Sequence, residues 1–403
     1  MGSEWSTKRL GDVITLKRGY DLPTRLREPG NVPIVSSSGI SGTHSQVKVA
    51  GPGVLTGRYG TIGKVFYIEE SFWPLNTTLY VQDFKGNHRR FIKYLLETID
   101  FEQFSDKAAV PGVNRNHLHE ALVSLPAVGI QEQIADSIAV LEDRIQNLRR
   151  VNVTLEAIAQ ALFKSWFVDF DPVRAKAESR DPEGMDAPTA ALFPDNFEDS
   201  EQGPIPEGWR VDSIYAVADV TYGAPFKSAL FNADQVGRPL VRIRDLRQEQ
   251  PGVWTAEEHR KGYLIQPGDI VVGMDGEFRT YLWGGEEAWL NQRVCVFHPR
   301  TPHGSVFLRN TISPLLGRVE ATVTATTVIH LGKKHIDEFR VLVPPDHVAR
   351  AFCERVQPLY DRVIAAKQSA RTLTNLRDTL LPRLISGKLR LPDAERKIEA
   401  ATA

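Results

Sequence analysis

A helical segment that occurs twice constrains the fold of this chain more than any other feature. Residues 131–166 read as one long helix whose apolar residues recur at alternating steps of three and four, as in a coiled-coil seam. The apolar seam residues are Ile138, Leu141, Ile145, Leu148, Leu155 and Leu162, with Asn152 and Ala159 at the remaining seam positions. The same positions 218 residues later hold Val356, Leu359, Val363, Ala366, Ala370, Leu373 and Leu380. The chain is therefore predicted to consist of two halves, each with a globular block followed by a long helix.

The two halves match at further points, and the offset between matched residues grows along the chain. It is 204 residues near the start of each half, 215 in the middle and 218 at the helices. The matched positions are Trp5 with Trp209, Gly19 with Gly223, Pro52-Gly53 with Pro267-Gly268, Leu75-Asn76 with Leu290-Asn291, and His117 with His335. A growing offset with an unchanged order is typical of a duplication whose surface loops have lengthened.

The 403 residues are too many for one core, so we predict an α+β chain with two mixed α/β domains. Short β-prone runs separated by Gly and Pro fill the first domain, together with a helix near residues 89–102. The predicted parts are residues 1–128 (first domain), 129–168 (first long helix), 169–204 (linker), 205–345 (second domain), 346–387 (second long helix) and 388–403 (tail).

Charge is distributed unevenly along the chain. The formal net charge is −1, yet residues 169–201 hold 10 acidic and 3 basic side chains, so the remainder carries a net charge of +6. A phosphate-facing surface is compatible with that remainder. The acidic stretch is rich in Pro and low in hydrophobicity, which predicts a partly extended linker. Pro358 lies inside the second long helix and predicts a kink or a restart there.

Several classes of catalytic and metal site find no support in the sequence. There is no G-x-x-x-x-G-K-[ST] phosphate loop, and Gly57–Gly63 has a G-x-x-G-x-x-G spacing that favours turns beside strands over a dinucleotide site. An amino-methyltransferase Pro-Pro-Tyr segment, an H-E-x-x-H pair and an evident Ser-His-Asp order are all missing. Cys295 and Cys353 form no metal-ligand or disulfide pattern. We therefore predict a chain with no catalytic residues, no metal site and no cofactor of its own.

Localisation is inferred from three patterns. No run of 18 apolar residues is present, so no membrane span is expected. The start of the chain lacks the charged and then apolar pattern of a signal peptide. With only two separated cysteines, the chain is predicted to be cytoplasmic.

Polar and basic side chains recur at matching points of both halves, and their types are those that hold phosphates and read base edges. Each alone would be an ordinary surface residue, but the recurrence favours nucleic-acid recognition. The predicted DNA-binding residues are Arg58, Tyr59, Lys64, Asn76, Thr77, Arg115, Asn116, Arg242, Arg244, Arg279, Tyr281, Asn291, Gln292, Arg293, Lys333 and Lys334.

The chain as a whole resembles the specificity (S) subunit of bacterial type I restriction–modification enzymes. The stretches that carry the resemblance are Trp5–Leu10 with Gly19, Gly57–Val65, Asn114–Pro126 running into Gln131–Ile134, Leu162–Arg174, Pro204–Trp209, Leu376–Leu381 and Leu384–Gly387. The resemblance implies two target-recognition domains separated by two long antiparallel helices. Each domain would read one half of a split sequence in double-stranded DNA.

Partners and cofactors follow from the same resemblance. Two methyltransferase (M) subunits would dock on the helices and methylate adenine N6 with S-adenosylmethionine. Motor-nuclease (R) subunits would join them for ATP- and Mg-dependent cleavage. Two other classes stay open: a single-chain DNA-modifying or restriction enzyme with an unrecognised active site, and a scaffold that binds no DNA.

Overall fold

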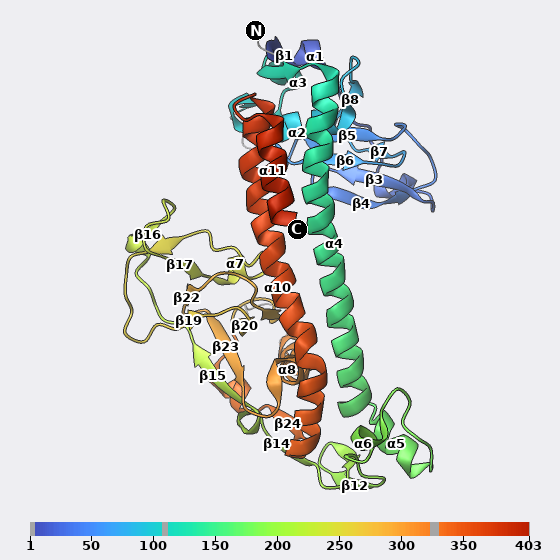
Figure 1. The fold of residues 1–403 in the computed structure, drawn as a ribbon, viewed down its shortest axis with the longest axis vertical. Helices are drawn as coiled ribbons and strands as arrows, with labels where there is room; N and C mark the ends of the chain where they lie inside the picture. Colours follow the sequence, from blue (N-terminus) through green and yellow to red (C-terminus); the bar gives the residue numbers. More distant parts are fainter. Residues whose placement is uncertain (1–4, 107–111, 323–329, 403) are drawn as a thin grey trace. The chain divides into compact units, whose positions relative to one another are not determined.

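The computed structural model describes residues 5–106, 112–322 and 330–402, and the chain divides into two compact units (Figure 1). The first unit comprises Met1–Gln146 and Thr372–Ala403, and the second comprises Asn147–Arg371. Helices α4 (Val128–Phe167) and α10 (Asp346–Ile385) each have 40 residues, and each begins in one unit and ends in the other.

The first unit is built on an antiparallel sheet with strand order β2-β8-β5-β6. A second sheet, β4-β3-β7, contains a parallel pair of strands, and β1 pairs with β11. The elements are β1 (Trp5–Arg9), α1 (Leu10–Val13), β2 (Thr15–Arg18), β3 (Val32–Ser36), β4 (Gly39–His44), β5 (Gly53–Gly57), β6 (Val65–Ile68), β7 (Trp73–Pro74), β8 (Thr78–Asp83), α2 (Arg89–Glu97), β9 (Ser105–Asp106), β10 (Gly112–Val113), α3 (Arg115–His119), β11 (Leu122–Pro126) and α11 (Leu391–Thr402). The short strands expected from the sequence are present, and the expected helix forms but ends at Glu97, short of residue 102.

The second unit repeats this topology. Its antiparallel sheet has the order β15-β23-β20-β21, β17 pairs in parallel with β22, and β14 pairs with β24. Its elements are α5 (Asp171–Ala177), α6 (Ala187–Ala190), β12 (Phe197–Ser200), β13 (Gly203–Pro206), β14 (Arg210–Ser213), β15 (Ala218–Tyr222), β16 (Phe231–Asn232), β17 (Arg238–Val241), α7 (Ile243–Leu246), β18 (Trp254–Thr255), β19 (Leu264–Ile265), β20 (Ile270–Gly273), β21 (Thr280–Leu282), β22 (Ala288–Leu290), β23 (Val294–Pro299), α8 (Gly304–Thr322), α9 (Lys333–Asp337) and β24 (Arg340–Val343).

Strand register confirms the duplication and corrects its two middle alignments. Ser6 pairs with Leu125 as Arg210 pairs with Val343, which fits the offsets of 204 and 218. In the middle of each half the offset is 216, because Ile34 pairs with Trp73 as Leu240 pairs with Trp289.

The predicted offset of 215 is therefore wrong by one residue for Leu75-Asn76. It is also wrong by one for Pro52-Gly53, because Leu55 and Val271 occupy the same place in their sheets. A Cβ atom on Gly19 would lie 2.1 Å from the carbonyl oxygen of Leu75, and one on Gly223 would lie 2.1 Å from that of Asn291. Leu75 thus corresponds to Asn291, and Asn76 to Gln292. The sequence alignment paired the two Leu-Asn dipeptides because they are identical, although their positions in the two loops differ by one residue.

The two long helices are antiparallel within the second unit. Trp166, late in α4, has its ring centroid 5.4 Å from that of Phe352, early in α10. Arg309 of α8 lies between Glu156, earlier in α4, and Tyr360, later in α10, with contacts of 3.0 and 3.4 Å. The predicted seam is largely buried, since the residues with low exposure include Ile138, Leu141, Ile145, Val356, Val363, Ala366, Leu373 and Leu380. Helix α10 continues through Pro358, so the expected restart is absent.

The acidic stretch 169–204 folds into α5, α6 and the hairpin β12–β13, so the prediction of a partly extended linker is wrong. Val173 and Phe193 from this stretch are buried in the core of the second unit. Phe193 packs edge-on against Trp166, with ring centroids 5.0 Å apart. The buried apolar side chains of this stretch hold it against the core although its average composition is polar.

Candidate nucleic-acid interface

Four loops of the second unit meet at one end of its antiparallel sheet. Asn291 N–H donates to the carbonyl of Val241 (3.1 Å), which joins the loop between β22 and β23 to the end of β17. Met274 N–H donates to Arg293 O (2.9 Å), and Leu331 N–H donates to Met274 O (2.7 Å). These bonds bring together the segments 242–247, 273–276, 291–293 and 330–333, which we call the four-loop end of the second unit.

The first unit has the corresponding four-loop end, made of the segments 36–39, 57–60, 75–77 and 112–115. Leu75 N–H donates to Val35 O (2.8 Å), Arg58 N–H donates to Thr77 O (2.8 Å), and Val113 N–H donates to Arg58 O (3.0 Å). The same three links therefore hold both ends. A surface built from loops on a rigid sheet can change its side chains without changing the fold.

A G-x-x-G turn forms the centre of each four-loop end. Gly60 and Gly276 close the two turns with φ values of 77° and 78°, a region that glycine enters without strain. Gly112 must also lack a side chain, because a Cβ atom there would lie 2.2 Å from the ring of Tyr59. The glycine-rich stretch is thus a turn beside strands, as its spacing predicts.

Arg58, Tyr59 and Thr77 are brought together in the first unit. The Arg58 guanidinium lies 4.5 Å from the centre of the Tyr59 ring, and that ring is exposed on the turn. Thr77 Oγ1 accepts a hydrogen bond from the backbone N–H of Ser37 (3.3 Å). The result is a half-buried cation beside an exposed aromatic ring, on a backbone held by hydrogen bonds.

The other predicted residues of the first unit surround this turn. Lys64 is exposed, and its carbonyl accepts the N–H of Gly57 (3.1 Å). The Asn76 side chain donates to Asp21. Arg115 and Asn116 form the first turn of α3 and are exposed.

Arginines 242 and 244 differ in their surroundings, although both follow β17. Arg242 Nε donates to Asp245 (3.0 Å), and the Asp245 carboxylate is nearly buried, so this guanidinium is committed to an ion pair. Arg244 is exposed on α7 and has no carboxylate within ion-pair distance among the residues that the structure describes. Arg244 therefore offers a charge to a ligand, whereas Arg242 holds the loop.

Carboxylates also hold two further cations of the second unit. Arg279 Nη1 lies 2.8 Å from Glu320 of α8, and Lys333 Nζ lies 2.8 Å from Asp337. The hydrogen bond from Lys333 lowers the pKa of Asp337, helped by a bond from Tyr215. Lys334 is exposed beside Lys333 at the start of α9.

The remaining predicted residues of the second unit lie on its loop between β22 and β23 or on β21. Asn291 and Arg293 flank Gln292, which is exposed. Tyr281 lies on β21, opposite Val271. Strand pairing makes Tyr281 the counterpart of Phe66 in the first unit, because Val271 corresponds to Leu55.

Most predicted residues of one unit correspond to predicted residues of the other once the register is corrected. The corresponding pairs are Lys64 with Arg279, Asn76 with Gln292, Thr77 with Arg293, Arg115 with Lys333, and Asn116 with Lys334. Arg58 is an exception, since its counterpart Met274 is buried. Whether any of these residues contacts DNA stays a prediction.

The sequence-based list omits three groups at the four-loop ends. Asp275 and His330 face each other at 2.8 Å, and the serine-rich segment 36–38 lies against Thr77. The repeated G-x-x-G spacing, Gly57 to Gly60 and Gly273 to Gly276, was the signal that would have pointed to Asp275.

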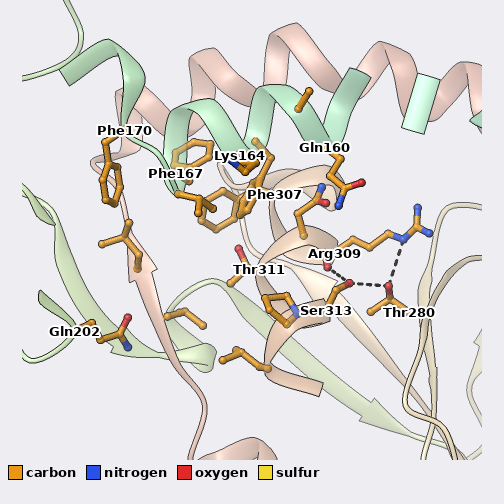
Figure 2. A pocket seen from close by; sticks show the side chains of 18 of the residues that line it. Gln160, Lys164, Phe167, Phe170, Gln202, Thr280, Phe307, Arg309, Thr311 and Ser313 are labelled. Atoms are coloured by element: carbon orange, nitrogen blue, oxygen red, sulfur yellow. Dashed lines mark hydrogen bonds between the residues drawn. The ribbon is translucent and has the colours of Figure 1, made fainter. Parts of the chain in front are cut away.

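A separate pocket of about 950 Å³ lies in the second unit between α4, α8, β13 and β24. Figure 2 shows Phe167 and Phe307 beside Gln160 and Lys164 at its helical wall. Arg309, Thr280 and Ser313 are joined by hydrogen bonds, with Thr280 Oγ1 2.9 Å from Ser313 Oγ (Figure 2). None of the predicted DNA-binding residues lines this pocket.

Within residues 5–106, 112–322 and 330–402, no group of three or more His, Cys, Asp or Glu side chains is placed to hold a metal ion. In the same ranges, no helix is long and apolar enough to cross a membrane. Both cysteines are free thiols, and burial raises the pKa of Cys295 to about 12.

Comparison with known proteins gives a consistent family. The model of the type I restriction modification DNA specificity domain matches residues 2–157 and again residues 206–373. The EcoBI specificity subunit of a type I restriction enzyme from Escherichia coli is 30% identical over 203 residues, a match that covers 48% of this chain and 43% of that subunit. The MjaIX specificity subunit from Methanocaldococcus jannaschii is 23% identical over 434 residues, covering 97% of this chain and 94% of that subunit.

A solved structure shares the fold. The crystal structure of the type I restriction-modification system S subunit from M. genitalium aligns with a TM-score of 0.57 and 17% identity. The alignment covers 94% of this chain and 96% of the other. At this identity the likeness concerns the fold, which is the duplicated α+β architecture with two long helices.

Proposed function

The chain belongs to the type I restriction modification DNA specificity family, and from that premise we propose that it is the sequence-specific DNA-recognition subunit of a type I restriction–modification complex. Each unit reads one half of a bipartite target in double-stranded DNA. The observation that carries the proposal is the four-loop end, which occurs in both units with the same three backbone links. Cationic and amide side chains on these loops are suited to phosphates and base edges.

In this proposal the chain supplies recognition and a scaffold but no catalysis. Two methyltransferase subunits contribute S-adenosylmethionine and the methyl-transfer chemistry, and motor-nuclease subunits contribute ATP, Mg²⁺ and cleavage. The long helices α4 and α10 are the proposed scaffold. The complex works in the cytoplasm, where its DNA target is found.

Methylation mapping tests the proposal. The chain is co-expressed with its partner methyltransferase, and methylated adenines are mapped in the host DNA. We expect a single split sequence with two specified halves and an unspecified spacer. Methylation without sequence preference, or a target with one specified half, would contradict the proposal.

The purified chain alone separates this function from the alternative of a single-chain enzyme. We expect no binding of S-adenosylmethionine and no incorporation of labelled methyl groups into DNA until the methyltransferase is added. Methyl transfer or DNA cleavage by the chain alone would show an active site in this chain instead. A filter-binding titration against salt separates both from a scaffold that binds no DNA.

A further inference from the structure

Three side chains from three different loops meet at the four-loop end of the second unit. His330 Nδ1 lies 2.8 Å from Asp275 Oδ1 and 3.2 Å from Arg293 Nη1. Arg293 Nε lies 3.6 Å from Asp275 Oδ2. The Arg293 side chain is 52% exposed and that of Asp275 is 29% exposed, so the guanidinium lies outermost.

The contacts divide the donors of Arg293 into two groups. Nε faces the Asp275 carboxylate and Nη1 lies near His330, while no hydrogen bond from Nη2 is found among the described residues. In either tautomer of His330, Nη1 and Nη2 each keep a hydrogen, and these two hydrogens form the free fork of the guanidinium. Such a planar fork matches two acceptors side by side, and in the major groove guanine O6 and N7 provide them.

The carboxylate makes a phosphate contact a poor assignment for Arg293. A negative charge beside the guanidinium repels a phosphate and weakens a contact that depends on charge. The same carboxylate, 3.6 Å from Nε, attracts the guanidinium and restricts where it lies, which favours the geometric match that base reading requires. The arrangement of the three side chains therefore favours a contact that depends on the orientation of the guanidinium over one that depends only on its charge.

We propose that Arg293 reads a guanine in the half-site of the second unit, and that Asp275 is the positioning residue that holds its guanidinium. The inference rests on the proposed function and assigns one base to one of its two domains. His330 Nδ1, when it carries the ring proton, donates to Asp275 Oδ1 at 2.8 Å and helps to hold the carboxylate.

The first unit lacks the arrangement of Asp275, Arg293 and His330, so the proposed guanine belongs only to the half-site of the second unit. Tyr59 stands at the position of Asp275, Thr77 at that of Arg293, and Gly112 at that of His330. None of the three carries a carboxylate or a guanidinium. Changes at Arg293 should therefore leave the half-site of the first unit as it is.

The test uses the complex of the full chain with its partner methyltransferase and selects bound sequences from a random DNA pool. In Arg293→Gln we expect one guanine of one half-site to be lost, with a shift towards adenine, whose N6 and N7 suit a glutamine amide. Discrimination at that position should fall roughly 5- to 150-fold. Arg293→Lys keeps the charge but not the fork, so it should relax the same position.

Asp275→Asn tests the positioning role. We expect guanine discrimination to weaken at the same position only, with an unchanged thermal unfolding midpoint. Relaxation spread over several positions, or a lowered midpoint with unchanged selectivity, would show a general structural role for Asp275 and overturn the positioning assignment.

The control is a second Arg–Asp ion pair, which lies at the other end of β23. Arg300 Nη2 lies 2.5 Å from Asp219, and Arg300→Gln should leave the selected sequence unchanged. If the Arg293→Gln complex selects the same DNA sequence as the wild type, or binds all sequences more weakly to the same degree, Arg293 does not read a base. The inference is then wrong, while the proposed function is unaffected. If the wild-type complex selects no sequence, the proposed function fails, and the inference with it.

Discussion

Lys367 of α10 binds Glu249, with its Nζ 2.5 Å from Glu249 Oε1, and both side chains are largely buried. Lys367 Nζ also donates to Leu282 O (2.7 Å), and the second Glu249 oxygen accepts the N–H of Gly284 (2.9 Å). Glu249 follows the segment 242–247, and its N–H donates to Leu246 O (3.3 Å). A long helix therefore anchors a loop of the candidate interface within the second unit.

Replacing Lys367 by Met should remove this anchor. The Glu249 carboxylate would keep its burial but lose its cation, which costs about 3 kcal/mol of unfolding free energy. Urea denaturation of the wild type and the variant measures the loss. Lys333→Met is a suitable comparison, because its ion pair with Asp337 is exposed and should contribute less than about 1 kcal/mol. Equal effects of the two variants would contradict the role given to burial.

Arg244→Ala should weaken DNA binding on all sequences. Its exposed guanidinium has no carboxylate partner among the described residues, so a phosphate is the contact we expect. Loss of one phosphate contact lowers the slope of log affinity against log salt by about one. Filter binding at several salt concentrations measures that slope. Arg242→Ala is the matched comparison, and it should change the slope less because Asp245 holds that guanidinium. An unchanged slope in Arg244→Ala would make this arginine an ordinary surface charge.

Stability should fall as the pH is lowered, and His119 is one cause. Its Nε2 accepts the backbone N–H of Leu16 (3.0 Å), a bond that requires the unprotonated ring. Burial lowers the pKa of His119 below its ordinary value of 6.5, and the nearby Arg115 adds to the effect. The unfolded chain therefore binds the proton more readily than the folded chain. The contribution of His119 is complete above pH 6.5 and is lost as the pH falls through its lower folded pKa.

Denaturation of His119→Gln at pH 8, 6.5 and 5 checks this assignment. A glutamine amide oxygen can accept the same hydrogen bond without titrating. We expect a smaller loss of stability on acidification than in the wild type. His303 should still contribute to the remaining slope, because burial lowers its pKa as well. A variant with the wild-type pH dependence would show that His119 is not the group involved.

The duplicated fold could be predicted from the sequence because its signals are periodic and local. The helix seam and the match of Trp5 with Trp209 required no knowledge of distant contacts, and β1 and β14 confirm the offset of 204. The alignment of Leu75 with Leu290 was wrong because it followed the identity of the residues, whereas the strand register matches Leu75 with Asn291. Strand pairing determines the correct alignment, and it is visible only in the three-dimensional structure.

The candidate site was less predictable, since the role of a polar side chain depends on neighbours from other loops. Arg242 and Arg244 look equivalent in sequence, but Asp245 makes one of them structural. Asp275 went unnoticed because an acidic residue gives no sequence signal for DNA binding. Its proposed role depends on Arg293 and His330, which come later in the chain and which the fold places beside it.

Phe193 lies in the acidic segment 169–204, whose composition wrongly predicted a partly extended linker. Its truncation tests whether that segment is part of the core. Its ring is 2% exposed and packs against Trp166, so the acidic segment is part of the core of the second unit. Phe193→Ala should lower the unfolding free energy by about 3–5 kcal/mol, as for other buried aromatic truncations. Fluorescence of the nearby tryptophans during urea denaturation measures it. Val168→Ala is the control, because Val168 is 54% exposed and its truncation should change stability by less than about 0.5 kcal/mol. If both variants were equally mild, the segment would be the extended linker that its charge and proline content suggest, and the packing of Val173 and Phe193 would contribute little to stability.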